Sequence, residues 1–129
     1  IKDIEIEVHA ISDIVRTMVL PAAFQFQERL ATSIKSLKDL IGDKYVTEQT
    51  KELTNVAAAI GRLQEGLAKL SHKSEEAEAM EDLPAKAAFF ASDIMAAMSE
   101  IREVADYLEE VIADDLWPLP KYREMLFLS

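Results

Sequence analysis

The sequence predicts an all-α protein: an antiparallel up-down-up bundle of three long helices, forming one domain over residues 1–129. Composition is the first reason, because only 3 of the 129 residues are Gly and 4 are Pro, while 50% are hydrophobic. Such a composition favours helices over a sheet protein, which needs many turns. The second reason is that apolar residues recur at intervals of three and four along three long segments, the spacing of one helix face.

The first predicted helix covers residues 4–41, and its apolar stripe runs from Ile4 through Met18 and Ala22 to Ile41. Pro21 lies inside this stripe, although a proline in a helix interior costs about 3 kcal/mol. Because the stripe keeps its phase on both sides of the proline, we expect one helix that is kinked at Pro21. Two helices that meet at residues 19–20 are the alternative. Gly42 is expected to end the segment by adopting a left-handed conformation.

The second predicted helix runs from residue 47 to the mid-70s, with Thr47 as the expected N-cap. Its apolar residues form a heptad seam: Leu53, Val56, Ile60, Leu63, Leu67 and Leu70. Gly61 and Gly66 lie off this seam, and we hypothesise that they let a neighbouring helix approach closely. Residues 74–82 carry five carboxylates. We expect this stretch to be a fraying helix end followed by a solvated loop.

The third predicted helix covers residues 84–114, with Pro84 at its first position, where a missing N–H costs nothing. Pro118 and Pro120 then end the helix and impose an extended link, after which we expect a short final helix. The proline-rich tail contains a dense apolar set, which we take as a candidate interface: Trp117, Pro118, Leu119, Pro120, Tyr122, Met125, Leu126 and Phe127. These residues either pack across the end of their own bundle or contact another domain or subunit, and both can hold together.

Charge and cysteine content exclude several function classes. A net charge of −10 repels phosphate backbones and anionic lipids, so nucleic acid and membrane partners are not expected. The sequence contains no cysteine. This excludes disulfides, thiolate zinc sites and cysteine nucleophiles, and it fits a cytoplasmic location. No apolar run approaches the roughly 20 residues that span a bilayer.

The sequence predicts no catalytic, cofactor-binding or metal-binding residue. His9 and His72 are the two histidines, and neither follows a glutamate at the Glu-x-x-His spacing of metal-binding bundles. Glu5 and His9 are four residues apart, and we interpret them as a surface pair rather than as metal ligands. A phosphotransfer role for His72 is disfavoured, because the neighbouring carboxylates repel a phosphoryl group.

Four carboxylates crowd the C-terminal end of the third predicted helix, where negative charge opposes the helix dipole: Glu109, Glu110, Asp114 and Asp115. We hypothesise that a basic surface elsewhere in a larger protein offsets this cost. The alternative is that the cost, at most about 1 kcal/mol for each carboxylate, is tolerated. If the repulsion is offset only by such a basic surface, neutralising Asp114 and Asp115 should stabilise the isolated chain.

The tail from Asp115 to Phe127, with its Leu-Trp-Pro-Leu-Pro-Lys-Tyr-Arg core, resembles the extreme C-terminus of type III glutamine synthetases. The stretch Met18-Val19-Leu20-Pro21-Ala22-Ala23, with Gln25, Gln27 and Leu30, is similar to the helix that follows the catalytic domain in that family. The tail motif is fairly specific, whereas the alanine-rich helices are not. The resemblance spans essentially the whole chain.

The resemblance implies a non-catalytic C-terminal helical domain that serves packing or oligomer assembly. It implies a parent enzyme that ligates ammonia to glutamate with ATP and a divalent metal, both bound in a separate catalytic domain. The expected partners are that catalytic domain and neighbouring subunits of a homo-oligomer. A second hypothesis is a free-standing adaptor or sensor bundle that binds a partner helix through its seam or its tail.

Overall fold

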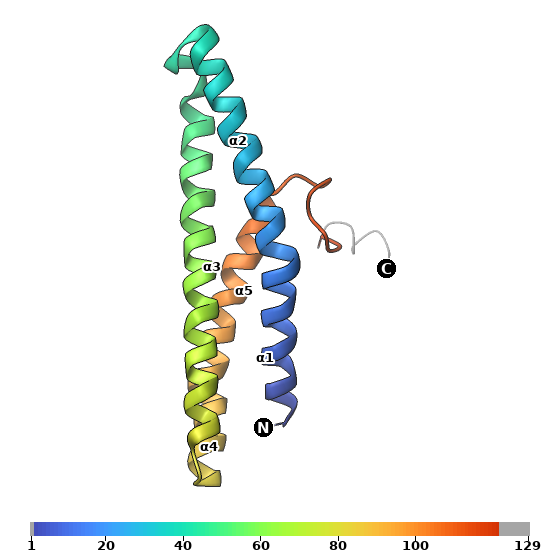
Figure 1. Ribbon diagram of the computed structural model, residues 1–129, viewed down its shortest axis with the longest axis vertical. Helices are drawn as coiled ribbons and strands as arrows, with labels where there is room; N and C mark the ends of the chain where they lie inside the picture. The colour runs from blue at the N-terminus through green and yellow to red at the C-terminus, as the bar shows by residue number, and fades with distance from the viewer. Residues whose placement is uncertain (1, 122–129) are drawn as a thin grey trace.

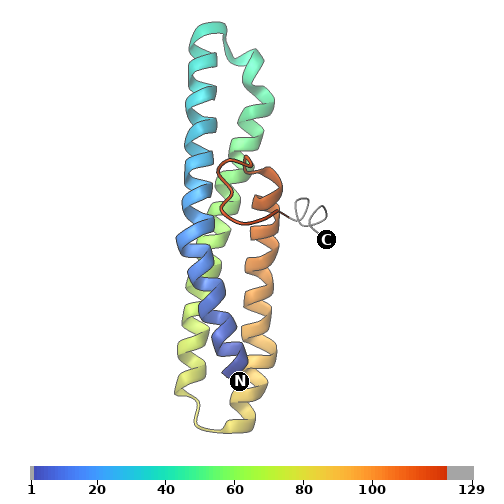
Figure 2. The ribbon, with the colours of Figure 1, turned by 90° about the vertical axis from the view of Figure 1, so that its right-hand side faces the viewer.

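The computed structural model describes residues 2–121, and these residues form helices joined by short connections, with no strand. The all-α prediction is therefore confirmed for the described part of the chain. Three long helical rods lie side by side, and the chain reverses direction at residues 42–46 and again at residues 80–82 (Figures 1 and 2). Within this range, no helix combines the length and apolar character needed to cross a membrane.

The first rod consists of α1 (Lys2–Ile14), a π-helical turn η1 (Val15–Val19) and α2 (Leu20–Ile41). The N–H of Leu20 donates to the carbonyl of Val15, one residue further back than in an α-helix. Pro21 follows directly after this wider turn, and the rod bends where α1 passes into α2 (Figure 1). The proline is therefore accommodated by a change of helix type, and the helix does not break.

The π-helical turn also shifts the phase of the apolar stripe. Val15 is 2% exposed, and the next buried side chain is Val19, also 2% exposed, whereas Met18 is 42% exposed. The expectation that Met18 and Ile41 lie on the core face was wrong. The extra residue in the turn places Val19 toward the core instead of Met18, while Ala22, Phe26 and Ile34 of the expected stripe are buried. Ile41 lies 52% exposed in the last turn before Gly42, where α2 extends beyond the third rod. Gly42 ends the rod with φ 93°, as expected.

A short 3₁₀ turn, η2 (Asp43–Val46), leads into α3 (Thr47–Ala79). The predicted N-cap at Thr47 was wrong: this residue already has helical dihedral angles, and its hydroxyl contacts the carbonyl of Lys44 at 3.5 Å. The predicted frayed end was also wrong, because α3 continues to Ala79 and fully buries Ala77. A small side chain near this end packs into the core despite its acidic neighbours.

The third rod consists of α4 (Leu83–Phe89), a second π-helical turn η3 (Phe90–Ile94) and α5 (Met95–Val111). Asp82 caps it, since its carboxylate accepts a hydrogen bond of 3.1 Å from the N–H of Ala85. Pro84 lies within the first turn, close to its predicted place. Beyond α5 the described tail has no regular helix. The predicted short final helix lies outside the described residues.

The core lies where all three rods meet, and α3 packs against both α2 and α5. Its largest fully buried side chains come from every rod: Val19, Val56, Leu63, Leu70, Ile94, Met98, Ile101, Leu108 and Ile112. The third rod ends well before the α2–α3 turn, so the hairpin of α2 and α3 extends beyond the bundle (Figures 1 and 2).

Candidate functional site

The described part of the tail turns back onto the bundle. Trp117 is 8% exposed and belongs to the hydrophobic core, and Leu116 and Leu119 pack against that core. Pro118 and Pro120 are exposed. Of the other candidate interface residues, Tyr122, Met125, Leu126 and Phe127 lie outside the described range. The tail therefore packs on its own bundle at least through Trp117, and its contact with a partner stays a prediction.

A buried lysine closes this loop of the tail. Lys121 is 8% exposed, and its ammonium donates a hydrogen bond to the carbonyl of Ile112, the residue that follows α5. The same Nζ lies 2.8 Å from Oδ1 of Asp114. The lysine thus satisfies a helix-end carbonyl that has no partner within the helix. It also neutralises one of the carboxylates that oppose the helix dipole.

Arg29 of α2 holds the neighbouring carboxylate. Its Nη1 and Nη2 lie 3.2 Å and 2.9 Å from the two oxygens of Asp115, which is a bidentate arrangement. The hydrogen bonds from Arg29 lower the pKa of the Asp115 carboxyl below its ordinary value of 3.8. Asp114 and Asp115 therefore receive cations from their own chain. For these two of the four carboxylates, this chain itself supplies the cations that the hypothesis sought on a basic surface elsewhere.

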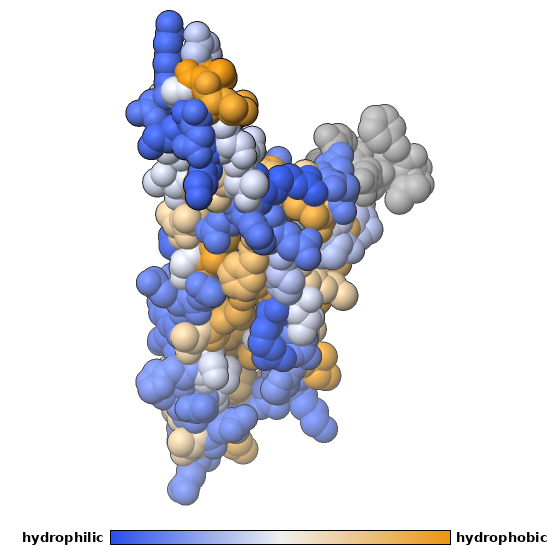
Figure 3. Space-filling model, turned by 45° about the horizontal axis from the view of Figure 1, so that its top comes forward, coloured by the Kyte–Doolittle hydropathy of each residue, from blue (hydrophilic) through white to orange (hydrophobic). Residues whose placement is uncertain are grey.

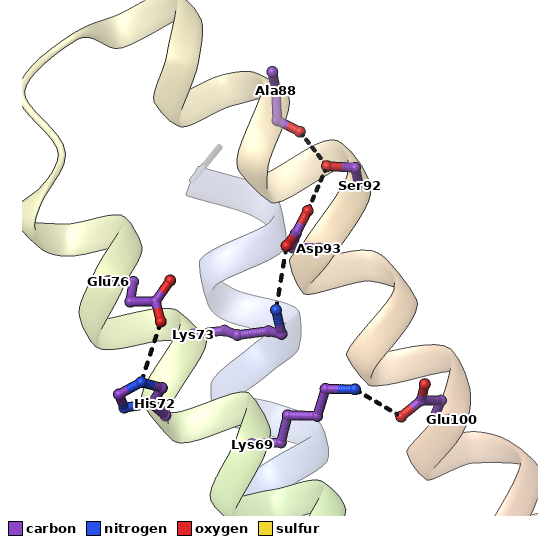
Figure 4. Close-up of polar contacts among 8 residues, drawn as sticks. All are labelled: Lys69, His72, Lys73, Glu76, Ala88, Ser92, Asp93 and Glu100. Atoms are coloured by element: carbon purple, nitrogen blue, oxygen red, sulfur yellow. Dashed lines mark hydrogen bonds and ion pairs between the residues drawn. The ribbon is translucent and has the colours of Figure 1, made fainter.

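Charged residues also link α3 to the third rod, along the edge drawn in Figure 4. Lys73 reaches Oδ2 of Asp93 at 3.2 Å, and its ammonium lies 5.7 Å from the ring centroid of Phe89. The hydroxyl of Ser92 donates to the other Asp93 oxygen at 2.9 Å. The bond from Ser92, and then that from Lys73, lower the pKa of Asp93. One turn earlier on α3, Nζ of Lys69 lies 3.5 Å from Oε2 of Glu100, which belongs to α5.

The histidines lie on the surface and apart from each other in the sequence. His72 contacts Glu76 at 3.1 Å within α3, an i, i+4 pair that the close-up also shows (Figure 4). His9 is exposed on α1. Over residues 2–121, no group of three or more His, Cys, Asp or Glu side chains is arranged to hold a metal ion.

Large apolar side chains are exposed at several places outside the core. Leu40, Ile41 and Tyr45 are 80%, 52% and 62% exposed around the α2–α3 turn. Apolar atoms gather at this end of the molecule in Figure 3. A second set lies on the first rod and contains Ile6, Ile14, Met18 and Phe24. Exposed apolar groups that are close together indicate surfaces used for contact with other polypeptide.

The reasoning from sequence missed both of these surfaces. The spacing of Met18 and Ile41 fits one helix face, but spacing reveals neither a π-helical turn, which exposes Met18, nor the place where a helix extends beyond its neighbours, which exposes Ile41. A signal was present for Ile6, because it lies on the side of α1 opposite the stripe, whereas Ile14 borders the stripe three residues after Ile11.

Comparison with known proteins identifies the family of the chain. Residues 1–38 match the family model described as glutamine synthetase C-terminal domain. The chain is 32% identical over 131 aligned residues to a type-3 glutamine synthetase of Dictyostelium discoideum, an alignment that covers 98% of this chain. The chain belongs to the C-terminal region of the type III glutamine synthetase family.

Two further glutamine synthetases are also similar to this chain. A glutamine synthetase of Bacteroides fragilis is 28% identical over 96% of the chain, and one of Butyrivibrio fibrisolvens is 30% identical over 98%. The chain spans 18% of the length of each of these relatives. The resemblance to the type III family is therefore confirmed, and it includes the bundle as well as the tail.

Proposed function

We propose that this chain is a non-catalytic packing and assembly domain of a type III glutamine synthetase. The proposal rests on one observation above all: among the described residues, charged side chains that lie where one rod meets another pair with one another. Arg29 with Asp115, and Lys73 with Asp93, are of this kind. Groups neutralised in this way stabilise the fold, whereas a catalytic acid or base needs a pKa shifted toward its working pH.

The parent enzyme would ligate ammonia to glutamate in the cytoplasm. ATP and a divalent metal would bind in its catalytic domain, outside this region. The bundle would then contact the catalytic domain of its own chain and neighbouring subunits of a homo-oligomer. Its net charge of −10 disfavours nucleic acid and anionic membranes as partners. The exposed tail prolines, Pro118 and Pro120, remain available to such contacts, and so do the apolar side chains around the α2–α3 turn.

An activity assay on the purified 129-residue chain tests the non-catalytic part of this proposal. The chain is supplied with glutamate, ammonia, ATP and Mg²⁺, and glutamine and phosphate release are measured. We expect no turnover and no ATP binding by calorimetry, while the full-length enzyme turns over under the same conditions. Glutamine formation by the chain alone would refute the proposal.

The assembly part needs the full-length enzyme. Removing residues 1–129 should reduce the mass of the assembly measured by sedimentation velocity. An assembly of unchanged subunit number, from a truncated enzyme that remains folded and monodisperse, would exclude a role of this region in oligomer formation.

A further inference from the structure

Helix α1 is held to the bundle by very little of its surface. Of its 13 residues, Val8 is the buried one. Ile4 and Ile11 are partly buried against the core. A helix of this length is marginal in water without tertiary packing. Nevertheless α1 carries two further isoleucines, Ile6 and Ile14, that the described bundle leaves exposed.

The uncovered isoleucines lie away from the core face. With about 100° of rotation per residue, Ile6 lies about 200° from Val8, nearly on the opposite side of α1. Ile6 is 65% exposed and Ile14 is 39% exposed. The π-helical turn η1 extends this outer face, because its extra residue leaves Met18 at 42% exposure. The first rod thus has one apolar face toward the bundle. Ile6 on the opposite side of α1, Ile14 on its flank at about 120° from Val8, and Met18 are exposed, and these three side chains together define its outer face.

The position of this outer face indicates what covers it. Ile6, Ile14 and Met18 fall within about 25 Å of residue 1, at the 1.5 Å rise per residue of a helix. More than four fifths of each relative lies outside the region that this chain matches. The family model describes a C-terminal domain, so most of that remaining polypeptide precedes residue 1 in the relatives. A covalently attached neighbour is present at high effective concentration.

We propose that the outer face of α1 and η1, formed by Ile6, Ile14 and Met18, packs against the polypeptide that precedes residue 1 in the full-length enzyme. This inference rests on the proposed function, since it requires the chain to be part of a larger synthetase. The receiving surface is apolar, because the exposed side chains that meet it are those of two isoleucines and a methionine. The first rod is then sandwiched between its own bundle and the rest of the enzyme.

Thiol labelling of the full-length enzyme tests the proposal. The region has no cysteine, so each introduced cysteine is unique within it and can be followed by peptide mass spectrometry. Two pairs are matched in exposure: Ile6→Cys at 65% with Leu83→Cys at 69%, and Ile14→Cys at 39% with Met95→Cys at 37%. The reagent is N-ethylmaleimide, a small uncharged probe that does not respond to the acidic surface.

We expect the α1 cysteine in each pair to react at least tenfold more slowly than its partner. Equal rates within both pairs would overturn the proposal. This result is distinct from failure of the proposed function. If removing residues 1–129 reduces the assembly while the paired rates are equal, the domain supports assembly through another surface. If the rates differ but the truncated enzyme assembles normally, the outer face of α1 is a contact that assembly does not need.

Discussion

Gly66 sets the distance between α3 and α5. A Cβ atom added there would lie 3.0 Å from Cγ1 of Ile101, a side chain that is 1% exposed. A Cβ atom at Gly61 would meet no atom within 4 Å. One of the two helix glycines therefore permits the close approach that the sequence suggested, and the other does not. The difference lies entirely in which side of α3 faces α5.

Replacing each glycine with alanine should separate these roles. Gly61→Ala should stabilise the protein by roughly 0.5–1 kcal/mol, because alanine loses less backbone entropy in a helix. Gly66→Ala gains the same entropy, but it also forces Ile101 to move. Overpacking a core in this way costs about 1–3 kcal/mol of stability. Urea denaturation measures both. A Gly66→Ala variant as stable as Gly61→Ala would show that α3 and α5 separate without cost.

The Arg29–Asp115 pair should make stability depend on pH. The pKa of Asp115 is lowered in the folded state. Its contribution is therefore present above the ordinary carboxyl pKa of 3.8 and is lost as the pH falls through the lowered value. The wild-type protein should have a higher melting temperature than Asp115→Asn near neutral pH, and the two melting temperatures should converge in acid.

Asp106→Asn, at an exposed position on α5, is the control for a simple change of net charge. Thermal melts between acid and neutral pH record all three proteins. Neutralising Asp115 is thus expected to destabilise the protein, contrary to the sign expected from helix-dipole repulsion alone. A melting temperature that rises in Asp115→Asn at neutral pH would mean that the dipole outweighs the ion pair.

At the scale of elements, the third rod begins where a single side chain caps it. The carboxylate of Asp82 accepts from the N–H of Ala85, which satisfies one of the free donors in the first turn. The three-residue connection before α4 leaves little else to fix the start of the helix. The direction in which the rod leaves the turn therefore depends on this cap and on Pro84.

Asp82→Ala should cost about 1 kcal/mol, within the range measured for lost N-caps. Glu81→Ala is the control, since it removes the same charge from the same connection without removing the bond to Ala85. The free energy of unfolding from urea titrations gives the effect, and hydrogen exchange at Ala85 should accelerate in Asp82→Ala alone. Equal effects of the two substitutions would assign the loss to charge.

At the scale of the whole molecule, the tail joins the C-terminal end of α5 to α2. Trp117 enters the core, Arg29 of α2 binds Asp115, and Lys121 returns to the carbonyl of Ile112. Figure 2 shows the tail looping across the bundle at this level. Among the described residues, the indole N–H of Trp117 has no hydrogen-bond partner. Packing and the flanking ionic contacts therefore hold the tail.

Trp117→Ala should destabilise the bundle by about 3–5 kcal/mol, as for other buried large-to-small substitutions. Thermal melting of the chain measures this loss, and sedimentation of the full-length enzyme shows whether assembly changes with it. Leu119→Ala, at a partly buried tail position, should cost less. A Trp117→Ala protein unchanged in both melting and sedimentation would rule out a role for the tail.

The sequence by itself determined the helical class and most of the core, because apolar spacing reports which side of a helix avoids water. Leu63 and Leu70 are completely buried as their heptad spacing predicts. Spacing carries no information about which residues of distant segments lie side by side. The long-range pairs of Arg29 with Asp115 and of Lys73 with Asp93 were therefore not predicted.

Only the tertiary structure decided the register and the surfaces. The π-helical turn η1 in the first rod places Met18 outward and Val19 inward. The relative lengths of the rods leave the α2–α3 turn uncovered, and the weak burial of α1 leaves its outer isoleucines exposed. Each of these depends on where one helix lies against another, and a linear pattern of residues records the faces of a helix but not its neighbours.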